Sequence, residues 1–163
     1  MSSSSRSVPG ARAPDPIDLR ERRLAIVREH MDSENTHDFD ATMATFDHPR
    51  YEIVPTGDVY DGPEEVATYF ETTRTAFPDQ RNQNATLRVA DDAIIAEFDL
   101  LGTHQGELRG IPATGRSFRC RVCAIFEFAD DSDHIICERV YFDQATIAQQ
   151  LLGEGGAGEG AVS

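Results

Sequence analysis

The sequence predicts an α+β domain in which helices pack on one face of a strongly curved, mainly antiparallel sheet. Two observations lead to this fold class. Helix-type spacing of apolar residues dominates from about residue 17 to 77, and strand-type alternation dominates from about 82 to 143. Helices that precede a run of antiparallel strands typically gather on one face of the sheet. A last apolar stretch, 144–153, predicts a short C-terminal helix.

The first predicted helix begins near Ile17. Leu24, Val27 and Met31 fall at positions i, i+3 and i+7, which is the apolar stripe of an amphipathic helix. His30 lies beside that stripe, and we interpret it as a helix-surface or packed histidine, because no other candidate group is near it in the sequence. A catalytic role for His30 is therefore not expected.

Shorter elements follow before the main sheet. Residues 36–46 predict a short helix, and 50–55 predict a strand that is limited by a proline at each end. Residues 56–62 are rich in Gly, Asp and Thr and predict a turn. Residues 63–77 predict a third helix, because a proline opens the segment and two glutamates follow in the first turn.

Four successive strands are expected over 82–90, 93–104, 116–129 and 133–143. In the third strand, one face is apolar and the other is polar. The apolar face contains Cys120, Val122, Ala124, Phe126 and Phe128. One side of the sheet should therefore pack on an apolar core while the other carries charged side chains.

Length and charge limit the class of protein. At 163 residues and 39% hydrophobic composition, the chain suits one domain, expected over 17–153, between a disordered tail (1–16) and a flexible glycine-rich tail (154–163). The net charge of −14 repels phosphate backbones and anionic lipids, so we expect no nucleic-acid or membrane partner. An apolar segment of signal or membrane-spanning length is lacking, which predicts a cytoplasmic protein.

No metal site is predicted. Cys120 and Cys123 would face opposite sides of a strand, and with Cys137 they are expected to be buried free thiols. The acidic run 130–133 lacks the glycine and distal glutamate of an EF-hand and predicts a hairpin turn.

Five short phrases, taken in order, resemble one known family. They are 57–62 (Gly-x-x-Tyr-x-Gly), 76–79 (Ala-Phe-Pro-Asp), 101–104 (Leu-Gly-Thr-His), 112–116 (Pro-Ala-Thr-Gly-Arg) and 138–143 (Glu-Arg-Val-Tyr-Phe-Asp). Together with the order of the elements, they resemble the SnoaL-like polyketide cyclases, also called ester cyclases, of the nuclear-transport-factor-2-like (NTF2-like) superfamily. The resemblance covers about residues 20–153 and implies a cone-shaped NTF2-like fold.

The resemblance also implies chemistry. In these cyclases an aspartate at the end of the last strand acts as acid and base in an aldol closure of a polyketide ester, without metal or cofactor, and Asp143 is the matching residue. The family's supporting histidine in the sheet has no counterpart in strand 116–129. A small hydrophobic molecule as ligand and a homodimer are further expectations.

Asp143 is the main catalytic candidate on physical grounds as well. A carboxylate in the wall of an apolar pocket loses solvation, so its pKa should rise towards neutrality, as a general base requires. Strand alternation places Asp143 on the same face as Cys137, Arg139 and Tyr141. The alternative is that Asp143 only caps the helix that follows.

The other candidates have alternative structural roles. His104, beside a glycine-rich connection, is the second candidate for proton transfer. Tyr51 and Tyr141 could donate to an oxyanion, and Arg139 could bind a carboxylate or an enolate. His48 is a candidate for substrate binding or for packing at the start of a strand.

Three function classes remain open from the sequence. The first is a cofactor-independent enzyme that cyclises or isomerises a hydrophobic carbonyl compound by proton transfer. The second is a non-catalytic binding protein with an apolar cavity. The third is an epoxide hydrolase, which would need Arg139, Arg119, Asp99 and Asp143 to converge around a water molecule.

Overall fold

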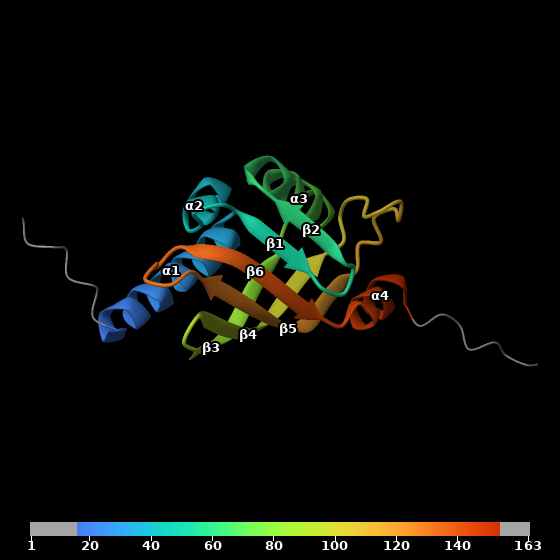
Figure 1. Cartoon of the computed structure of the whole chain (residues 1–163). Coiled ribbons are helices and arrows are strands. Elements are labelled where there is room, and N and C mark those ends of the chain that lie inside the picture. The colour runs from blue at the N-terminus through green and yellow to red at the C-terminus, as the bar shows by residue number, and fades with distance from the viewer. Residues whose placement is uncertain (1–15, 154–163) are drawn as a thin grey trace, which may run out of the picture.

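The computed structural model describes residues 16–153 and confirms the α+β fold class. The helices and strands follow the order α1 (Pro16–Thr36), α2 (Phe39–Ala44), β1 (Arg50–Ile53), β2 (Asp58–Asp61), α3 (Pro63–Ala76), β3 (Arg81–Val89), β4 (Ala93–Thr103), β5 (Ser117–Phe128), β6 (Ile135–Phe142) and α4 (Gln144–Leu152). Figure 1 shows α1, α2 and α3 on one side of a curved sheet and α4 beyond the end of β6.

The strands form a six-stranded mixed sheet in the order β2-β1-β6-β5-β4-β3. Only the β1–β6 pair is parallel; the other pairs are antiparallel. β2 was not predicted from the sequence, because 58–61 lies within a segment of turn-forming residues. The β1–β2 hairpin forms one edge of the sheet, where a strand of four residues suffices.

The helix starts follow from local chemistry. Asp38 caps α2 by accepting a hydrogen bond from the Ala41 amide. Pro63 opens α3 after Gly62, whose φ of +95° suits glycine. Asp143 caps α4 by accepting hydrogen bonds from the amides of Ala145 and Thr146.

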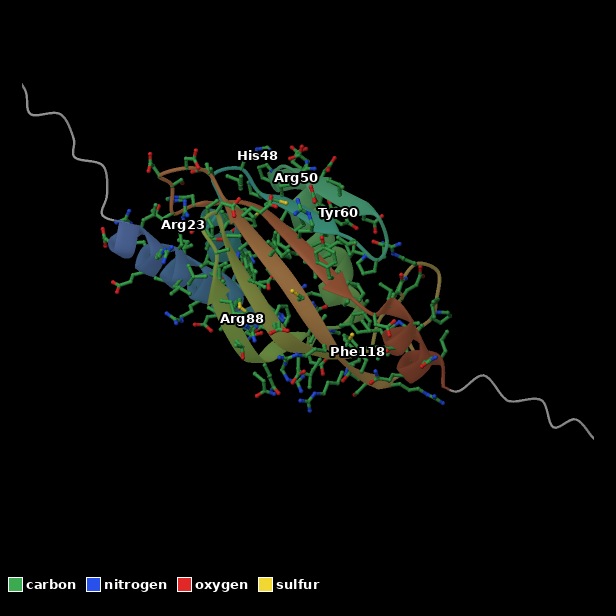
Figure 2. All side chains as sticks on the ribbon, turned by 60° about the horizontal axis from the view of Figure 1, so that its bottom comes forward. Arg23, His48, Arg50, Tyr60, Arg88 and Phe118 are labelled. Atoms are coloured by element: carbon green, nitrogen blue, oxygen red, sulfur yellow. The ribbon has the colours of Figure 1, made fainter. Side chains whose placement is uncertain are left out.

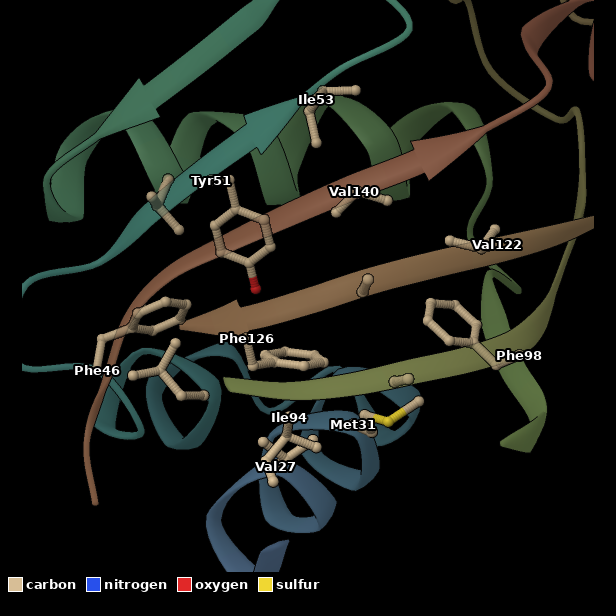
Figure 3. Packing of buried hydrophobic residues seen from close by; sticks show 14 of the residues in the cluster. Val27, Met31, Phe46, Tyr51, Ile53, Ile94, Phe98, Val122, Phe126 and Val140 are labelled. Carbon is tan, nitrogen blue, oxygen red and sulfur yellow. The ribbon is translucent and has the colours of Figure 1, made fainter. Parts of the chain in front are cut away.

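The core lies between the helices and the inner face of the sheet. The predicted apolar face of the third long strand is confirmed, because Val122, Ala124, Phe126 and Phe128 of β5 are buried. Phe46, Tyr51 and Phe126 gather at one end of this core, and Phe98 and Val122 lie towards the other (Figure 3). The outer face carries ion pairs such as Arg139 with Glu52 and Glu127.

A β-bulge in β6 decides which side chains face the core. Glu127 pairs with Cys137, but the next residue of β5, Phe128, pairs with Ile135, so Ile136 has no partner in this register. After the bulge, Glu138, Val140 and Phe142 share the inner face with the apolar residues of β5. Their neighbours in the strand therefore face outwards.

The predicted tails lie outside the described residues, except that Pro16 is the first residue of α1. Among the described residues, no helix is long and apolar enough to span a membrane.

The core assignment predicts unequal costs for the same substitution at two strand positions. Ile94 of β4 is fully buried, whereas Ile136 of β6 is 39% exposed. Ile94→Ala should lower the free energy of unfolding by about 2–5 kcal/mol, because it leaves a cavity. Ile136→Ala should cost about 0.5 kcal/mol or less. Urea unfolding of both variants measures the difference, and equal costs would contradict the assignment.

Candidate functional site

A cavity of about 200 Å³ opens between the sheet and helices α3 and α4. Its wall includes the phenylalanines Phe77, Phe98, Phe118 and Phe142. Three tyrosines also line it, namely Tyr51, Tyr60 and Tyr69. Two glutamates, Glu34 and Glu138, complete its buried end, whereas Asp58, Arg109 and Gln144 lie at more exposed positions of the wall.

The buried end holds a hydrogen-bonded group of four side chains, His30, Glu34, Tyr51 and Glu138, which we call the buried cluster. The His30 Nε2 atom lies 3.0 Å from Glu138 Oε2, 3.0 Å from the Tyr51 hydroxyl and 3.7 Å from Glu34 Oε1. Tyr51 donates its hydroxyl proton to Glu34 Oε1 at 3.1 Å. His30 is not part of the cavity wall and lies behind the two carboxylates.

Three elements bring this cluster together. His30 and Glu34 are four residues apart in α1, so both project from the same helix face. Tyr51 of β1 is the register partner of Glu138 in β6. Glu138 in turn pairs with Phe126 of β5, which places its carboxylate on the apolar inner face.

The contacts of His30 indicate an imidazolium ion. The Thr45 hydroxyl donates to the Thr42 carbonyl at 2.6 Å, so its oxygen is free to accept a hydrogen bond from His30 Nδ1 at 2.9 Å. The other ring nitrogen faces the carboxylate of Glu138. Burial alone would lower the pKa of His30, but Glu138 and Glu34 outweigh it and raise the pKa to about 9.

The two glutamates have different pKa shifts. For Glu34, burial favours the neutral form, but the hydrogen bond and charge of His30, together with Arg74 and Tyr51, lower its pKa overall. For Glu138, burial is the main cause of a raised pKa, and the negative charge of Glu34 adds to it. The Glu34 carboxylate therefore stays ionised, while the Glu138 carboxylate is suited to gain and lose a proton.

Metal binding is the other chemistry that these groups could support. One ligand atom each from His30, Glu34 and Glu138 lie within 4.8 Å of one another. A metal would need the lone pair of His30 Nε2, yet this atom is placed to donate a proton to Glu138 and Tyr51. A proton on His30 Nε2 satisfies both hydrogen bonds, so these contacts favour acid–base chemistry over metal binding.

Asp143 lies outside the wall of the cavity. It is exposed and accepts hydrogen bonds from the Thr146 hydroxyl and from the amides of Ala145 and Thr146. These bonds, with the Thr146 hydroxyl as the largest cause, lower its pKa. The expectation of a raised pKa in a pocket wall is therefore wrong for Asp143, and its catalytic role stays a prediction.

Of the other sequence candidates, only Tyr51 lines the cavity. Arg139 pairs with Glu52 at 2.6 Å and with Glu127 at 2.6 Å on the outer face of the sheet, and Tyr141 is exposed there. His48 is exposed and pairs with Asp61 at 2.8 Å, close to Arg50 at the rim of the molecule (Figure 2). These three residues are not brought together with the buried cluster.

His104 is fully buried but is also absent from the cavity wall. Its Nδ1 atom lies 3.1 Å from the Thr114 hydroxyl, and its ring packs on Phe77 with a centroid distance of 5.5 Å. It therefore holds the connection between β4 and β5 to the end of α3.

The four residues proposed for an epoxide hydrolase do not converge either. Asp99 pairs with Arg119 and, at 3.3 Å, with Arg121, while Arg139 has its own two carboxylate partners. None of these residues lines the cavity.

Three members of the buried cluster, His30, Glu34 and Glu138, were not predicted from the sequence. His30 is packed, which is one of its two interpretations, but the expectation that no candidate group lies near it is wrong. One signal was present, because His30 and Glu34 have the i, i+4 spacing that places two side chains on one helix face. Glu138 gave no comparable signal. Alternation puts Glu138 and Asp143 on opposite faces of the strand, so the expectation that Asp143 faces the pocket directed attention away from Glu138.

Comparisons with known proteins agree with this architecture. A family model described as SnoaL-like polyketide cyclase matches residues 25–151. A candidate SnoaL-like polyketide cyclase from Jannaschia sp. CCS1 is similar in structure, with a TM-score of 0.74 and 17% identity over 93% of this chain and 99% of that chain. No curated protein matches the chain in sequence.

Two further solved structures share the fold. AclR, a candidate hydroxylase from Streptomyces galilaeus, gives a TM-score of 0.70 at 16% identity over 86% of this chain and 87% of that chain. An NTF2-like protein from Burkholderia thailandensis E264 gives a TM-score of 0.66 at 22% identity over 78% of this chain and 95% of that chain. These structures confirm the NTF2-like fold that the sequence phrases predicted.

The charge state of the buried cluster predicts a pH dependence of stability. The pKa of His30 is about 9 in the folded protein and about 6.5 when it is unfolded. Its stabilising effect should be complete below about pH 6.5 and lost as the pH rises through about 9, a difference of about 3 kcal/mol. Urea unfolding at several pH values tests this, and an unfolding free energy that stays constant across this window would contradict an imidazolium at His30.

Proposed function

The chain belongs to the SnoaL-like polyketide cyclase family, and from this premise we propose that it transfers protons to and from carbon in a hydrophobic carbonyl compound. The observation that carries the proposal is the carboxylate of Glu138, which lines the cavity with a raised pKa and is hydrogen-bonded to His30 at 3.0 Å. A base with a raised pKa removes a weakly acidic proton more effectively than an ordinary carboxylate does.

In the proposed step, the ionised Glu138 carboxylate takes a proton from the carbon next to the carbonyl group. The electron pair of the broken carbon–hydrogen bond moves to the carbonyl oxygen and gives an enolate. Protonated Glu138 then returns the proton to the same or another carbon. In an aldol closure, the enolate carbon instead forms a bond to a second carbonyl carbon, the π electron pair of that carbonyl moves to its oxygen, and this oxygen takes the proton from Glu138. His30 holds the Glu138 carboxylate in place through their hydrogen bond and stabilises its negative charge. His30 is therefore a positioning residue.

The cavity suits a small hydrophobic ligand. Its wall contains four phenylalanines and three tyrosines. A cavity of about 150 Å³ accommodates benzene, so the cavity of about 200 Å³ suits a molecule of one or two rings. Larger substrates would extend past Asp58 and Arg109 towards solvent, as part of a polyketide chain could.

Other functions make different predictions. A binding protein without activity would hold such a molecule and leave its carbon-bound hydrogens in place. A hydroxylase, as AclR is described, would instead add an oxygen atom to the ligand. The homodimer expected from the family resemblance stays a prediction.

Proton transfer can be tested without knowledge of the natural substrate. Acetophenone, 1-tetralone and 2-acetylnaphthalene are incubated with the protein in D₂O, and mass spectrometry measures deuterium at the carbon next to the carbonyl. We expect incorporation above the rate in buffer for at least one ketone. Glu138→Gln should reduce the enzymatic rate by at least about 100-fold, because general base catalysis of this kind contributes about 10²–10⁴.

Asp143→Asn is the matched control, since it makes the same carboxylate-to-amide change at the residue that the sequence favoured. Asparagine is also a good N-cap, so the variant should fold normally and retain the wild-type rate. If Asp143→Asn loses exchange while Glu138→Gln keeps it, the assignment to Glu138 is wrong. Binding of a ketone without exchange in the wild type would indicate a binding protein.

A further inference from the structure

Tyr69 presents an unused hydroxyl group to the cavity. It lies in α3 and lines the wall together with Thr72 and Thr73, on the helix face that covers the inner side of the sheet. Its hydroxyl forms no hydrogen bond with any of the described residues, whereas that of Tyr51 is bonded to both His30 and Glu34. A tyrosine hydroxyl at a buried position usually has a partner.

The aromatic neighbours of Tyr69 fix its position beside the buried cluster. Its ring centroid lies 5.3 Å from that of Tyr51 and 4.9 Å from that of Tyr60, and both of these residues also line the cavity. Phe70, the next residue in α3, is buried in the core and prevents the helix from turning Tyr69 away. The Tyr69 ring is therefore held beside Tyr51 of the buried cluster by packing and not by a hydrogen bond of its hydroxyl.

The charges around the cavity define what this hydroxyl can bind. At the buried end, the carboxylates of Glu34 and Glu138 face the His30 imidazolium, and the charge of Arg74 also acts on Glu34, so this end has no net positive charge to attract an anionic ligand group. Burial is the main cause of a raised pKa at Tyr69, and the charges of Glu34 and Glu138 act in the same direction. Tyr69 thus keeps its proton at neutral pH and can donate a hydrogen bond to a ligand acceptor.

We propose that Tyr69 donates a hydrogen bond to the carbonyl oxygen of the ligand, and that the ligand class is a neutral cyclic or aromatic ketone or ester. The inference rests on the proposed function and adds the group that orients the substrate. A carbonyl oxygen bound to Tyr69 would place the adjacent carbon towards Glu138. The same hydrogen bond would strengthen as negative charge develops on the oxygen in the enolate.

The first test measures binding alone and does not depend on catalysis. Equilibrium dialysis compares 1-tetralone with tetralin, which has the same two rings and lacks the carbonyl oxygen. Tyr69→Phe removes only the hydroxyl oxygen and should weaken binding of 1-tetralone about fivefold to tenfold, the value of one neutral hydrogen bond. Its affinity for tetralin should stay unchanged.

Tyr141→Phe is the matched control, because it removes a tyrosine hydroxyl from the outer face of the sheet. It should bind both compounds as the wild type does. The proposal is overturned if Tyr69→Phe binds 1-tetralone with wild-type affinity, or if it loses affinity for both compounds equally, which would indicate a packing role. Absence of 1-tetralone binding to the wild type would overturn the ligand class.

Deuterium exchange separates this inference from the proposed function. We expect Tyr69→Phe to reduce exchange into 1-tetralone about 100-fold, as for loss of an oxyanion donor. Tyr69-dependent binding without any exchange in the wild type would support the carbonyl site and contradict proton transfer. Exchange that depends on Glu138 but not on Tyr69 would support proton transfer and contradict the role of Tyr69.

Discussion

The contact between His30 and Glu138 is the interaction on which the candidate site depends. Both side chains are buried, and each favours the charged form of the other. The pair also joins α1 to the centre of the sheet, and it reaches β1 through Tyr51. Loss of Glu138 would leave His30 with Glu34, at 3.7 Å, as its carboxylate partner, whereas loss of His30 would remove the imidazolium from both carboxylates.

The topology explains why this polar group lies in an otherwise apolar core. β1 inserts parallel to β6 at the edge of the antiparallel meander, so Tyr51 meets Glu138 in register. The long helix α1 then crosses the inner face and supplies His30 and Glu34 from one side. Because the cavity is bounded by α3 and α4 on the other side, the carboxylates face both a fixed cation and an open space. In this arrangement Glu34 keeps its charge, while Glu138 can exchange a proton with a ligand.

The sequence predicted the fold better than the site, for physical reasons that particular residues illustrate. Helix spacing around Val27 and Met31 and the alternation of Val122, Ala124 and Phe126 are local patterns, and each matches the structure. That Glu138 faces the core follows from its pairing with the buried Phe126 of β5, which is a property of the assembled sheet. Asp143 is a carboxylate at a strand end, which suits a catalytic base, but the same position also suits a helix N-cap, and Asp143 caps α4.

The protonation state of the His30 ring is the most direct test of the ion pair between His30 and Glu138. In protein labelled with ¹⁵N at histidine, NMR spectroscopy reports the protonation of each ring nitrogen as the pH is raised. We expect both nitrogens of His30 to stay protonated through neutral pH and the ring to titrate near pH 9. A His30 ring that is already neutral at pH 7 would contradict the ion pair with Glu138, and with it the assignment of Glu138 as the base.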